Sequence, residues 1–215
     1  MGKPYGRSCV LITGATTGIG YELAELYAKD KNNLILVARD EDRLNEVKEI
    51  LSLYSINVYT IALDLSEDNS CEKIFDFVNK NNLSVDILIN NAGIGSFGYL
   101  TDIEIEKELK LIDLNIRALT ELTKIFLPIM IDHGEGAIMN VASTAAFSAG
   151  PKMATYYASK SYVLNFTEAL YEEVKGSNIK VSCLCPGPVK TSFQEKSGIR
   201  KKEAAKKALM TAKEV

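Results

Sequence analysis

A chain of 215 residues with 47% hydrophobic and 25% charged residues has the composition of a soluble globular protein with a substantial core. Its net charge of -3 at pH 7 argues against a nucleic-acid-binding surface, for which a strong positive field is expected. No apolar run approaches the roughly 18 residues of a membrane-spanning helix, and the start of the chain contains no signal-peptide core. We therefore expect a cytoplasmic protein without a membrane span.

The predicted elements alternate along the chain between short hydrophobic runs, typical of strands covered on both faces, and longer amphipathic stretches. The predicted strands cover residues 8–13, 33–39, 57–63, 86–90, 136–142 and 178–185. The predicted helices cover residues 18–30, 41–54, 67–80, 101–131 and 155–175. Ser66 and Thr101 resemble helix starts, and we expect a break in the longest helical stretch near residues 113–115.

This alternation predicts the fold class α/β, with a doubly wound parallel β-sheet (a Rossmann fold), helices on both faces and right-handed crossovers. Ligands of such sheets bind at the carboxyl ends of the strands. No internal repeat, low-complexity block or linker interrupts the chain, so residues 1–215 are predicted to form a single dinucleotide-binding and catalytic domain.

The first predicted strand leads directly into a glycine-rich turn, TGATTGIG at residues 13–20, which a helix follows. Glycines allow a tight turn and close approach of the backbone to a pyrophosphate, which then sits at the positive end of the helix. The spacing is G-x-x-x-G-x-G rather than G-x-G-x-x-G, so a plain tight turn is the alternative. No Gly-Lys-Ser/Thr follows, which excludes a phosphate loop of the ATPase kind.

The end of the second predicted strand bears on the choice of dinucleotide. Ala38 offers no carboxylate to a ribose 2′-hydroxyl, whereas Arg39 offers a planar cation that suits a 2′-phosphate. We therefore expect NADP(H) rather than NAD(H). Asp40 is the counter-argument, because its carboxylate could turn inward toward the ribose or pair with Arg39 at the surface.

The cysteines and the single histidine bear on metal chemistry. Cys9, Cys71, Cys183 and Cys185 show no metal-type pairing, and the last two lie two residues apart in an apolar segment, facing one side of a strand. We interpret them as structural thiols in a reducing cytoplasm. His133, in a turn-like stretch, cannot by itself form a His-rich zinc site. No metal is expected, and acid–base chemistry needs another group.

A series of motifs in order resembles the short-chain dehydrogenase/reductase family, in its Rossmann-type branch. They are TGxxxGIG at 13–20, NNAG at 90–93, Ser143, YxxxK at 156–160 and PG at 186–187. The resemblance runs from residue 8 to about residue 193 and implies an oxidoreductase that moves a hydride between a nicotinamide dinucleotide and an alcohol/carbonyl pair. From the family pattern we expect the C-terminal end to be incomplete, because the chain stops at Val215 before the family's last helix and seventh strand.

The resemblance assigns the proton transfer to Tyr156. Lys160, four residues later, lies on the same helix face, where its charge would favour the phenolate of a group whose pKa is ordinarily about 10. In the family this lysine also binds the nicotinamide ribose. Tyr157 has no lysine at i+4 and is expected to pack.

The resemblance adds two further catalytic residues. Ser143 would orient the substrate carbonyl and stabilise its developing negative charge, with Thr144 as the neighbouring competitor. Asn115 would complete the catalytic tetrad and hold a proton-relay water; the alternative for it is a polar helix residue that stabilises a kink.

The same resemblance lays the dinucleotide along the strand ends, with Asp64 at the adenine edge and Thr191 near the carboxamide. Asn91 could instead mainly tie strands together. The expected cofactor-binding residues are Gly14, Thr16, Thr17, Gly18, Ile19, Gly20, Arg39, Asp64, Leu65, Asn91, Ala92, Gly93, Tyr156, Lys160, Pro186, Gly187, Val189 and Thr191.

The candidate substrate wall is mostly apolar and favours an apolar ketone, a steroid-like compound or an acyl compound over a sugar. It comprises Phe97, Ala145, Phe147, Gly150, Pro188 and Phe193, with residues 188–215 as the substrate-loop region. A basic run is either a solvated helix face or a docking surface for an acidic carrier protein. That run comprises Lys190, Lys196, Arg200, Lys201 and Lys202.

The family's usual oligomer contacts fall in residues 101–131 and 155–175, so a homodimer or homotetramer is expected. One alternative is a catalytically silent nucleotide-binding regulatory protein of the same fold, which the intact catalytic set opposes. The other is an extended-type epimerase or dehydratase on nucleotide sugars, which would need a different glycine spacing and usually a longer chain.

Overall fold

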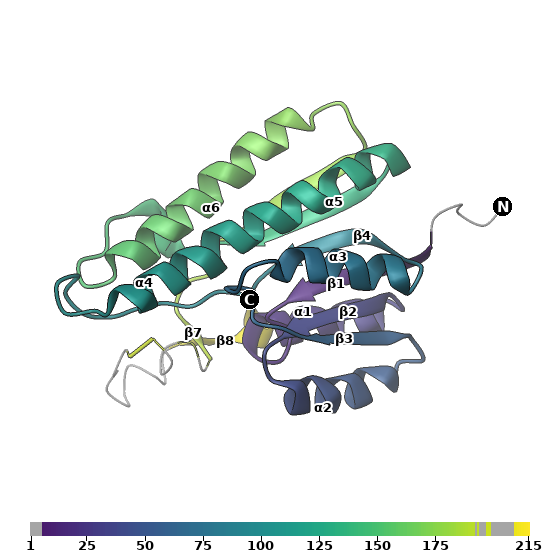
Figure 1. Ribbon diagram of the computed structural model, residues 1–215, viewed down its shortest axis with the longest axis horizontal. Coiled ribbons are helices and arrows are strands. Elements are labelled where there is room, and N and C mark those ends of the chain that lie inside the picture. The colour runs from purple at the N-terminus through teal and green to yellow at the C-terminus, as the bar shows by residue number, and fades with distance from the viewer. Residues whose placement is uncertain (1–5, 192, 194–196, 199–208) are drawn as a thin grey trace.

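The computed structural model (Figure 1) describes residues 6–191, 193, 197–198 and 209–215. Its main sheet is six-stranded and parallel, in the order β3-β2-β1-β4-β5-β6. The strands are β1 (Arg7–Thr13), β2 (Asn33–Ala38), β3 (Val58–Ala62), β4 (Leu83–Asn90), β5 (Gly136–Val141) and β6 (Ile179–Leu184). Strand order reverses between β1 and β4, so the predicted doubly wound sheet is confirmed.

Helices cover both faces of this sheet. They are α1 (Gly18–Lys29), α2 (Glu41–Ser52), α3 (Ser70–Lys80), α4 (Ile105–Ile112), α5 (Leu119–His133) and α6 (Ala154–Glu173), with short helical segments η1 (Asp113–Ala118) and η2 (Thr144–Phe147). Figure 1 shows α5 and α6 running side by side on one side of the sheet, with α2 on the other. Among the described helices, none is long and apolar enough to cross a bilayer.

The side chains of β1 point alternately to the two faces of the sheet, and each set contributes to the hydrophobic core on its own face. Val10 and Ile12 are buried against α1 and α2, whereas Cys9 and Leu11 are buried against α3, α5 and α6. Because both faces are covered, the strand reads as a continuous apolar run, as expected for a parallel sheet.

Two helices begin later than predicted. Ser66 does not start α3, because its N–H and hydroxyl both donate to the Asp64 carboxylate, at 3.1 and 2.6 Å, and hold a turn instead. Thr101 does not start α4, which begins at Ile105; its hydroxyl donates to Asp102 at 2.9 Å. In both places a local side-chain hydrogen bond competes with the helix.

The expected break near residues 113–115 is a π-helical turn, η1, that joins α4 to α5 without leaving the helix. Such turns insert one extra residue per turn and often lie at functional sites. Here the turn contains Asn115, which is 2% exposed.

A buried polar network links the strands that carry the candidate site. The side-chain amide of Asn90 donates to Thr123 Oγ1 at 3.1 Å and to Asn140 Oδ1 at 2.9 Å, and the Asn140 amide donates to Thr167 Oγ1 at 3.0 Å. These bonds tie β4 and β5 to α5 and α6, so they hold the helix that carries Tyr156 in register with the strand ends.

The C-terminal part returns to the body of the protein. A two-stranded parallel pair joins β7 (Val189–Lys190) to β8 (Met210–Thr211), and the short segment η3 (Ala212–Glu214) packs on α1. Of the basic run considered above, Lys190 is exposed. The other members, Lys196, Arg200, Lys201 and Lys202, lie outside the described residues.

Candidate active site

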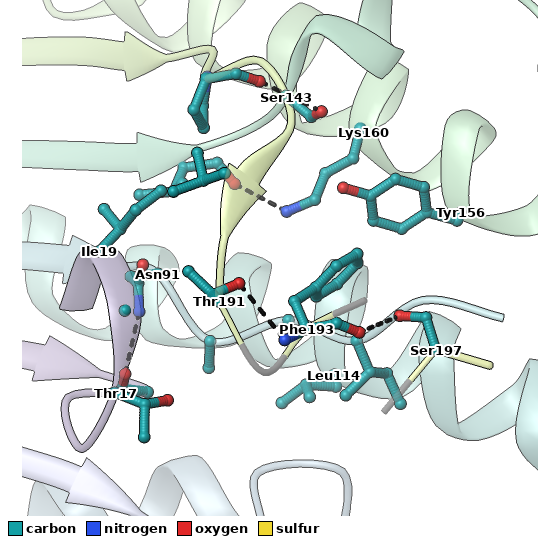
Figure 2. Close-up of a pocket in the computed structure, with 18 of the residues that line it drawn as sticks. Thr17, Ile19, Asn91, Leu114, Ser143, Tyr156, Lys160, Thr191, Phe193 and Ser197 are labelled. Atoms are coloured by element: carbon teal, nitrogen blue, oxygen red, sulfur yellow. Dashed lines mark hydrogen bonds between the residues drawn. The ribbon is translucent and has the colours of Figure 1, made fainter. Parts of the chain in front are cut away.

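A cavity of about 540 Å³ lies at the carboxyl ends of the strands, and Figure 2 shows side chains that line it. Its lining contains most of the predicted site residues. These are Gly14, Thr16, Thr17, Gly18, Ile19, Arg39, Asp64, Leu65, Asn91, Ala92, Gly93, Ser143, Tyr156, Lys160, Pro186, Gly187, Val189 and Thr191. Gly20 and Asn115 are not part of this lining.

The glycine loop folds tightly on itself. Gly14 and Gly18 have φ of +67° and +59°, in the left-handed region that disfavours side chains. A Cβ at Gly20 would lie 2.3 Å from the Gly14 carbonyl oxygen and 2.4 Å from Asn91 Nδ2. Gly20 therefore permits close packing between the loop and the start of α1 rather than contact with the cavity.

The start of α1 fits an anionic group. Thr17 precedes the helix in an extended conformation and makes no side-chain capping bond. The first N–H groups of a helix have no partners within it, and they attract a phosphate through both hydrogen bonds and the helix dipole. Because Thr16, Thr17 and Gly18 also line the cavity, the loop has the form of a pyrophosphate cradle.

Asn91 lines the cavity and also ties two strands together, which was its alternative role. Its side-chain amide donates to the Thr13 and Gly14 carbonyls at 2.8 and 3.1 Å. In return, Thr13 Oγ1 accepts from the N–H groups of Asn91 and Ala92, at 3.0 and 2.9 Å. These bonds join the ends of β1 and β4 where the strand order reverses.

Where the cavity meets the carboxyl end of β2, the Asp64 carboxylate forms ion pairs with two basic side chains. Its Oδ2 lies 2.9 Å from Lys110 Nζ and 3.6 Å from Arg39 Nη1. Burial disfavours the ionised carboxyl, but hydrogen bonds from Ser66 and Lys110 outweigh it and lower the pKa of Asp64 to about 2. The carboxylate is therefore ionised at neutral pH and orients the Arg39 side chain.

Asp40 lines the cavity, as its inward alternative expected, and does not pair with Arg39. Its Oδ1 accepts the Arg43 N–H at 3.0 Å and so caps α2, while Arg39 pairs with Asp64 instead. Arg43, which sequence reasoning missed, lines the cavity beside Arg39. The sequence could have indicated Arg43, because this arginine lies four residues after Arg39 in the first turn of a predicted helix.

Tyr156 and Lys160 lie one turn apart on α6 and both line the cavity. They are 9% and 6% exposed, so neither side chain points into bulk water. Lys160 Nζ donates to the Val141 carbonyl at 2.8 Å, and Ser143 Oγ accepts the Ala145 N–H at 3.1 Å. Figure 2 shows the Tyr156 hydroxyl turned toward the Lys160 side chain.

The pKa of Tyr156 differs from the sequence expectation. Burial raises it, and the hydrogen bond with Ser143 opposes this only in part. Burial also lowers the pKa of Lys160 to about 8, and its ammonium is directed to the Val141 carbonyl. The protein alone therefore holds Tyr156 as a neutral phenol at pH 7, the form that donates a proton.

Asn115 does not line the cavity but binds the backbone of residues that border it. Its Oδ1 accepts the Ile94 N–H at 2.9 Å, and its Nδ2 donates to the Ile94 carbonyl at 2.9 Å and to Ser159 Oγ at 3.0 Å. Ser159 Oγ in turn donates to the Tyr156 carbonyl at 2.7 Å. Both amide protons are used, so this side chain positions the loop after β4 and the first turn of α6.

We expect Asn115→Ala to lower the free energy of unfolding by about 2 kcal/mol or more, because the N–H and the carbonyl of Ile94 both lose their partner. Urea denaturation monitored by circular dichroism measures the loss. Asn165→Ala is the matched control, since Asn165 makes one exposed bond to Ser161; it should cost about 0.5 kcal/mol or less. Equal losses in the two variants would contradict the bracing role of Asn115.

The structure places part of the predicted substrate wall in the cavity lining. Phe97, Ala145, Pro188 and Phe193 line the cavity, whereas Phe147 is 67% exposed and does not. Gly150 is also outside the lining, because it packs on the ring of Tyr157. Tyr157 packs as expected, but it lines the cavity too. The lining residues that sequence reasoning missed include Ile94, Leu114, Met153 and Ser197.

Comparisons with known proteins agree on one family. A family profile described as short chain dehydrogenase matches residues 8–202. Dehydrogenase/reductase SDR family member 4 from Bos taurus is 32% identical over 192 residues, which are 89% of this chain and 69% of the relative.

Two solved structures have a similar fold. A short-chain dehydrogenase from Sphingobium yanoikuyae in complex with NADPH has a TM-score of 0.88 and 31% identity, over 97% of this chain and 80% of that one. A short chain dehydrogenase/reductase from Burkholderia phymatum in complex with NAD has a TM-score of 0.85 and 27% identity, over 99% and 84% of the two chains. Similar proteins therefore bind either dinucleotide.

Proposed function

Because this chain belongs to the short-chain dehydrogenase/reductase family of oxidoreductases, we propose that it interconverts a carbonyl compound and its alcohol with NADP(H), using Tyr156 as general acid and base. One observation carries the proposal. Tyr156 and Lys160 lie one turn apart, nearly buried, in the same cavity as an uncapped, glycine-rich helix start. Bound there, the dinucleotide would donate or accept the hydride.

The side chains divide the proton chemistry between them. In the reducing direction the neutral phenol of Tyr156 gives its proton to the carbonyl oxygen as negative charge develops there. Ser143 borders the same part of the cavity, and its hydroxyl donates a hydrogen bond that orients that oxygen. In the reverse direction the phenolate accepts the proton of the alcohol.

Lys160 has donors left for the dinucleotide. An ammonium has three protons, and the Val141 carbonyl takes one of them. The remaining two suit the ribose hydroxyls next to the nicotinamide. A Cβ at Gly93 would lie 3.4 Å from Lys160 Nζ, so the glycine keeps the space beside the ammonium open.

The preference for NADP(H) rests on two guanidinium groups. Arg39 and Arg43 both line the β2 end of the cavity, and the 3.6 Å contact of Arg39 with Asp64 leaves most of its donors unused. A 2′-phosphate between them would gain charge-assisted hydrogen bonds. Asp40 lines the cavity too, but its Oδ1 accepts the Arg43 N–H as the cap of α2, and we expect this to hold the carboxylate away from the ribose.

The function is tested by NADPH oxidation with a panel of carbonyl compounds, in which apolar ketones are expected to be better substrates than sugars. In the Arg39→Ala/Arg43→Ala double variant, the KM for NADPH is expected to rise by about 10- to 100-fold, the loss of charge-assisted hydrogen bonds, while the KM for NADH changes little.

Arg7→Ala is the matched control for this pair. Arg7 lies at the opposite end of β1, where its guanidinium donates to the Tyr59 hydroxyl. Its KM values are expected to match the wild type. A wild-type protein that uses NADH better than NADPH, or a double variant that loses both dinucleotides equally, would refute the cofactor preference.

The proposed substrate class follows from the apolar side chains in the cavity lining. Phe97, Met153, Pro188 and Phe193 supply this apolar surface. Such a lining favours a ketone with apolar substituents, because a sugar would leave its hydroxyl groups without partners there.

We also infer self-association through α4. Ile105, Leu109 and Ile112 follow each other at helical spacing and are 60%, 51% and 38% exposed. An exposed apolar stripe of this kind is typical of an interface. It supports the expected homodimer or homotetramer.

A further inference from the structure

Two thiols that the proposed chemistry does not use lie side by side at the end of β6, with Cys183 in the strand and Cys185 directly after its last residue. Cys183 and Cys185 are free and half-buried, and their Sγ atoms are 3.8 Å apart. Residues two apart on a strand face the same side. The 3.8 Å separation shows that Cys185 keeps this orientation just past the end of β6. β6 is at one edge of the described main sheet, with β5 as its neighbour.

The spacing suits an atom between the sulfurs better than a bond joining them. A disulfide requires about 2.05 Å between its sulfurs, and two residues of extended strand already span about 6.7 Å, the long limit for its Cα atoms. Two sulfurs each bonded at about 2.3 Å to one atom lie between about 3.3 Å apart at a right angle and about 3.8 Å apart at the tetrahedral angle. The observed separation of 3.8 Å is at the upper end of this range, so a bridging atom with smaller bond angles requires the sulfurs to approach each other by only a few tenths of an ångström.

The surroundings limit what that centre can be. The thiols pack with the apolar residues Leu119, Ala142 and Val163, and Phe166 borders the group. Within the described chain no set of three or more His, Cys, Asp or Glu side chains comes together, so the pair offers two sulfurs as ligands, with the Thr167 hydroxyl as a hydrogen-bond partner of Cys183. This suits an atom that needs only two thiol ligands and brings an apolar substituent of its own.

We propose that Cys183 and Cys185 form a dithiol site for trivalent organoarsenicals and chemically similar thiophilic centres. With an arsenoxide, two As–S bonds form while the As–O bonds of the oxide break. The two S–H protons leave with that oxygen as water, and neither sulfur nor arsenic changes oxidation state. Burial raises the pKa of Cys183 to about 11, which makes its thiolate rare at pH 7 and slows the exchange without changing its overall balance.

An adduct at this site would disturb the residues that support Lys160 and Ser143 of the proposed active site. Val163, which belongs to the apolar cluster on which the pair packs, lies three residues after Lys160 on α6, and Ala142 immediately precedes Ser143. Cys185 itself precedes Pro186, whose carbonyl accepts the Ser143 hydroxyl at 3.5 Å. A bulky group there would displace these supports. This second step rests on the proposed function; the binding step does not.

Intact-protein mass spectrometry with phenylarsine oxide tests the binding. The native protein should gain one phenylarsenic group in place of two hydrogens, and an excess of dithiothreitol should reverse this while 2-mercaptoethanol should not. In Cys183→Ser and in Cys185→Ser, no adduct should remain after treatment with 2-mercaptoethanol. Cys9→Ser and Cys71→Ser are controls that keep it, since each of these thiols is 1% exposed and lies in another part of the core.

Circular dichroism shows whether each serine variant is folded. If Cys183→Ser is unfolded, Cys183→Ala is used in its place. An adduct that persists in the Cys183→Ser/Cys185→Ser double variant, or that forms only in denaturant, would overturn the site. In parallel, NADPH oxidation by the adduct is expected to fall about tenfold or more. If the adduct kept full activity, the proposed effect of the dithiol site on Lys160 would be wrong. If the wild-type protein showed no turnover at all, the proposed function would be wrong, while the mass-spectrometric test of binding would still hold.

Discussion

Tyr156→Phe should lower kcat for carbonyl reduction by roughly 10³-fold, the contribution of a well-placed general acid. The ring of Tyr156 packs against Phe193, with centroids 5.3 Å apart, and phenylalanine preserves that contact. The dissociation constant for NADPH, measured by fluorescence titration, should therefore change little. Steady-state NADPH oxidation with the best ketone of the panel gives kcat.

Tyr157→Phe is the sharpest control for this variant. Tyr157 is the next residue, lies edge-on to Tyr156 with centroids 6.0 Å apart, and also lines the cavity. Loss of its hydroxyl should leave kcat within a few-fold of the wild type. If Tyr157→Phe were inactive and Tyr156→Phe active, the proton would have to come from the neighbouring phenol.

Lys160→Met should abolish most turnover and weaken NADPH binding, yet it should not lower stability at pH 7. The ammonium is 6% exposed, and burial lowers its pKa from 10.5 to about 8. Holding it charged in the folded state costs on the order of 3 kcal/mol. Methionine removes that cost and gives up the bond to the Val141 carbonyl, which contributes about 1 kcal/mol.

The pH dependence has a defined sign. Between pH 8 and 10.5 the unfolded chain keeps the Lys160 proton and the folded protein loses it, so the unfolded state binds more protons. The stability of the wild type relative to Lys160→Met should therefore rise with pH through this window, and the advantage of the variant should shrink. Below pH 8 the advantage is present in full.

Urea denaturation of both proteins at a series of pH values from 7 to 10 measures this difference. Lys124→Met, on the exposed face of α5, is the control and should show no such trend relative to the wild type. A Lys160→Met protein that is less stable than the wild type at every pH, with a constant difference, would show that burial of the ammonium is not the dominant effect.

Much of the fold was predictable because it depends on patterns within single elements. The continuous apolar run of β1 indicated a strand covered on both faces, and the structure confirms it. The glycine spacing after it and the i, i+4 spacing of Tyr156 and Lys160 are likewise local, and both groups line one cavity. Strand boundaries differ by up to three residues, as at β4, which begins at Leu83 rather than residue 86.

The errors have a common physical origin in partners that lie far along the chain or in competing local bonds. The position of Asp64 between Lys110 and Arg39 decided that Arg39 does not pair with Asp40. Phe147 has the right composition for a pocket wall, yet η2 leaves it exposed. Composition and periodicity report how a residue prefers to be buried, but not which residue covers it.

The amino-acid sequence by itself determined the order of strands and helices, the cradle at the start of α1 and the placing of Tyr156 beside Lys160 on one helix face, because turn, cap and periodicity preferences act over a few residues. Only the tertiary structure decided the protonation of that pair and the bracing of the cavity by Asn115. A pKa depends on burial and on the carbonyl that a charge meets, here that of Val141, 19 residues from Lys160. Such contacts exist only once the sheet and its helices have packed together.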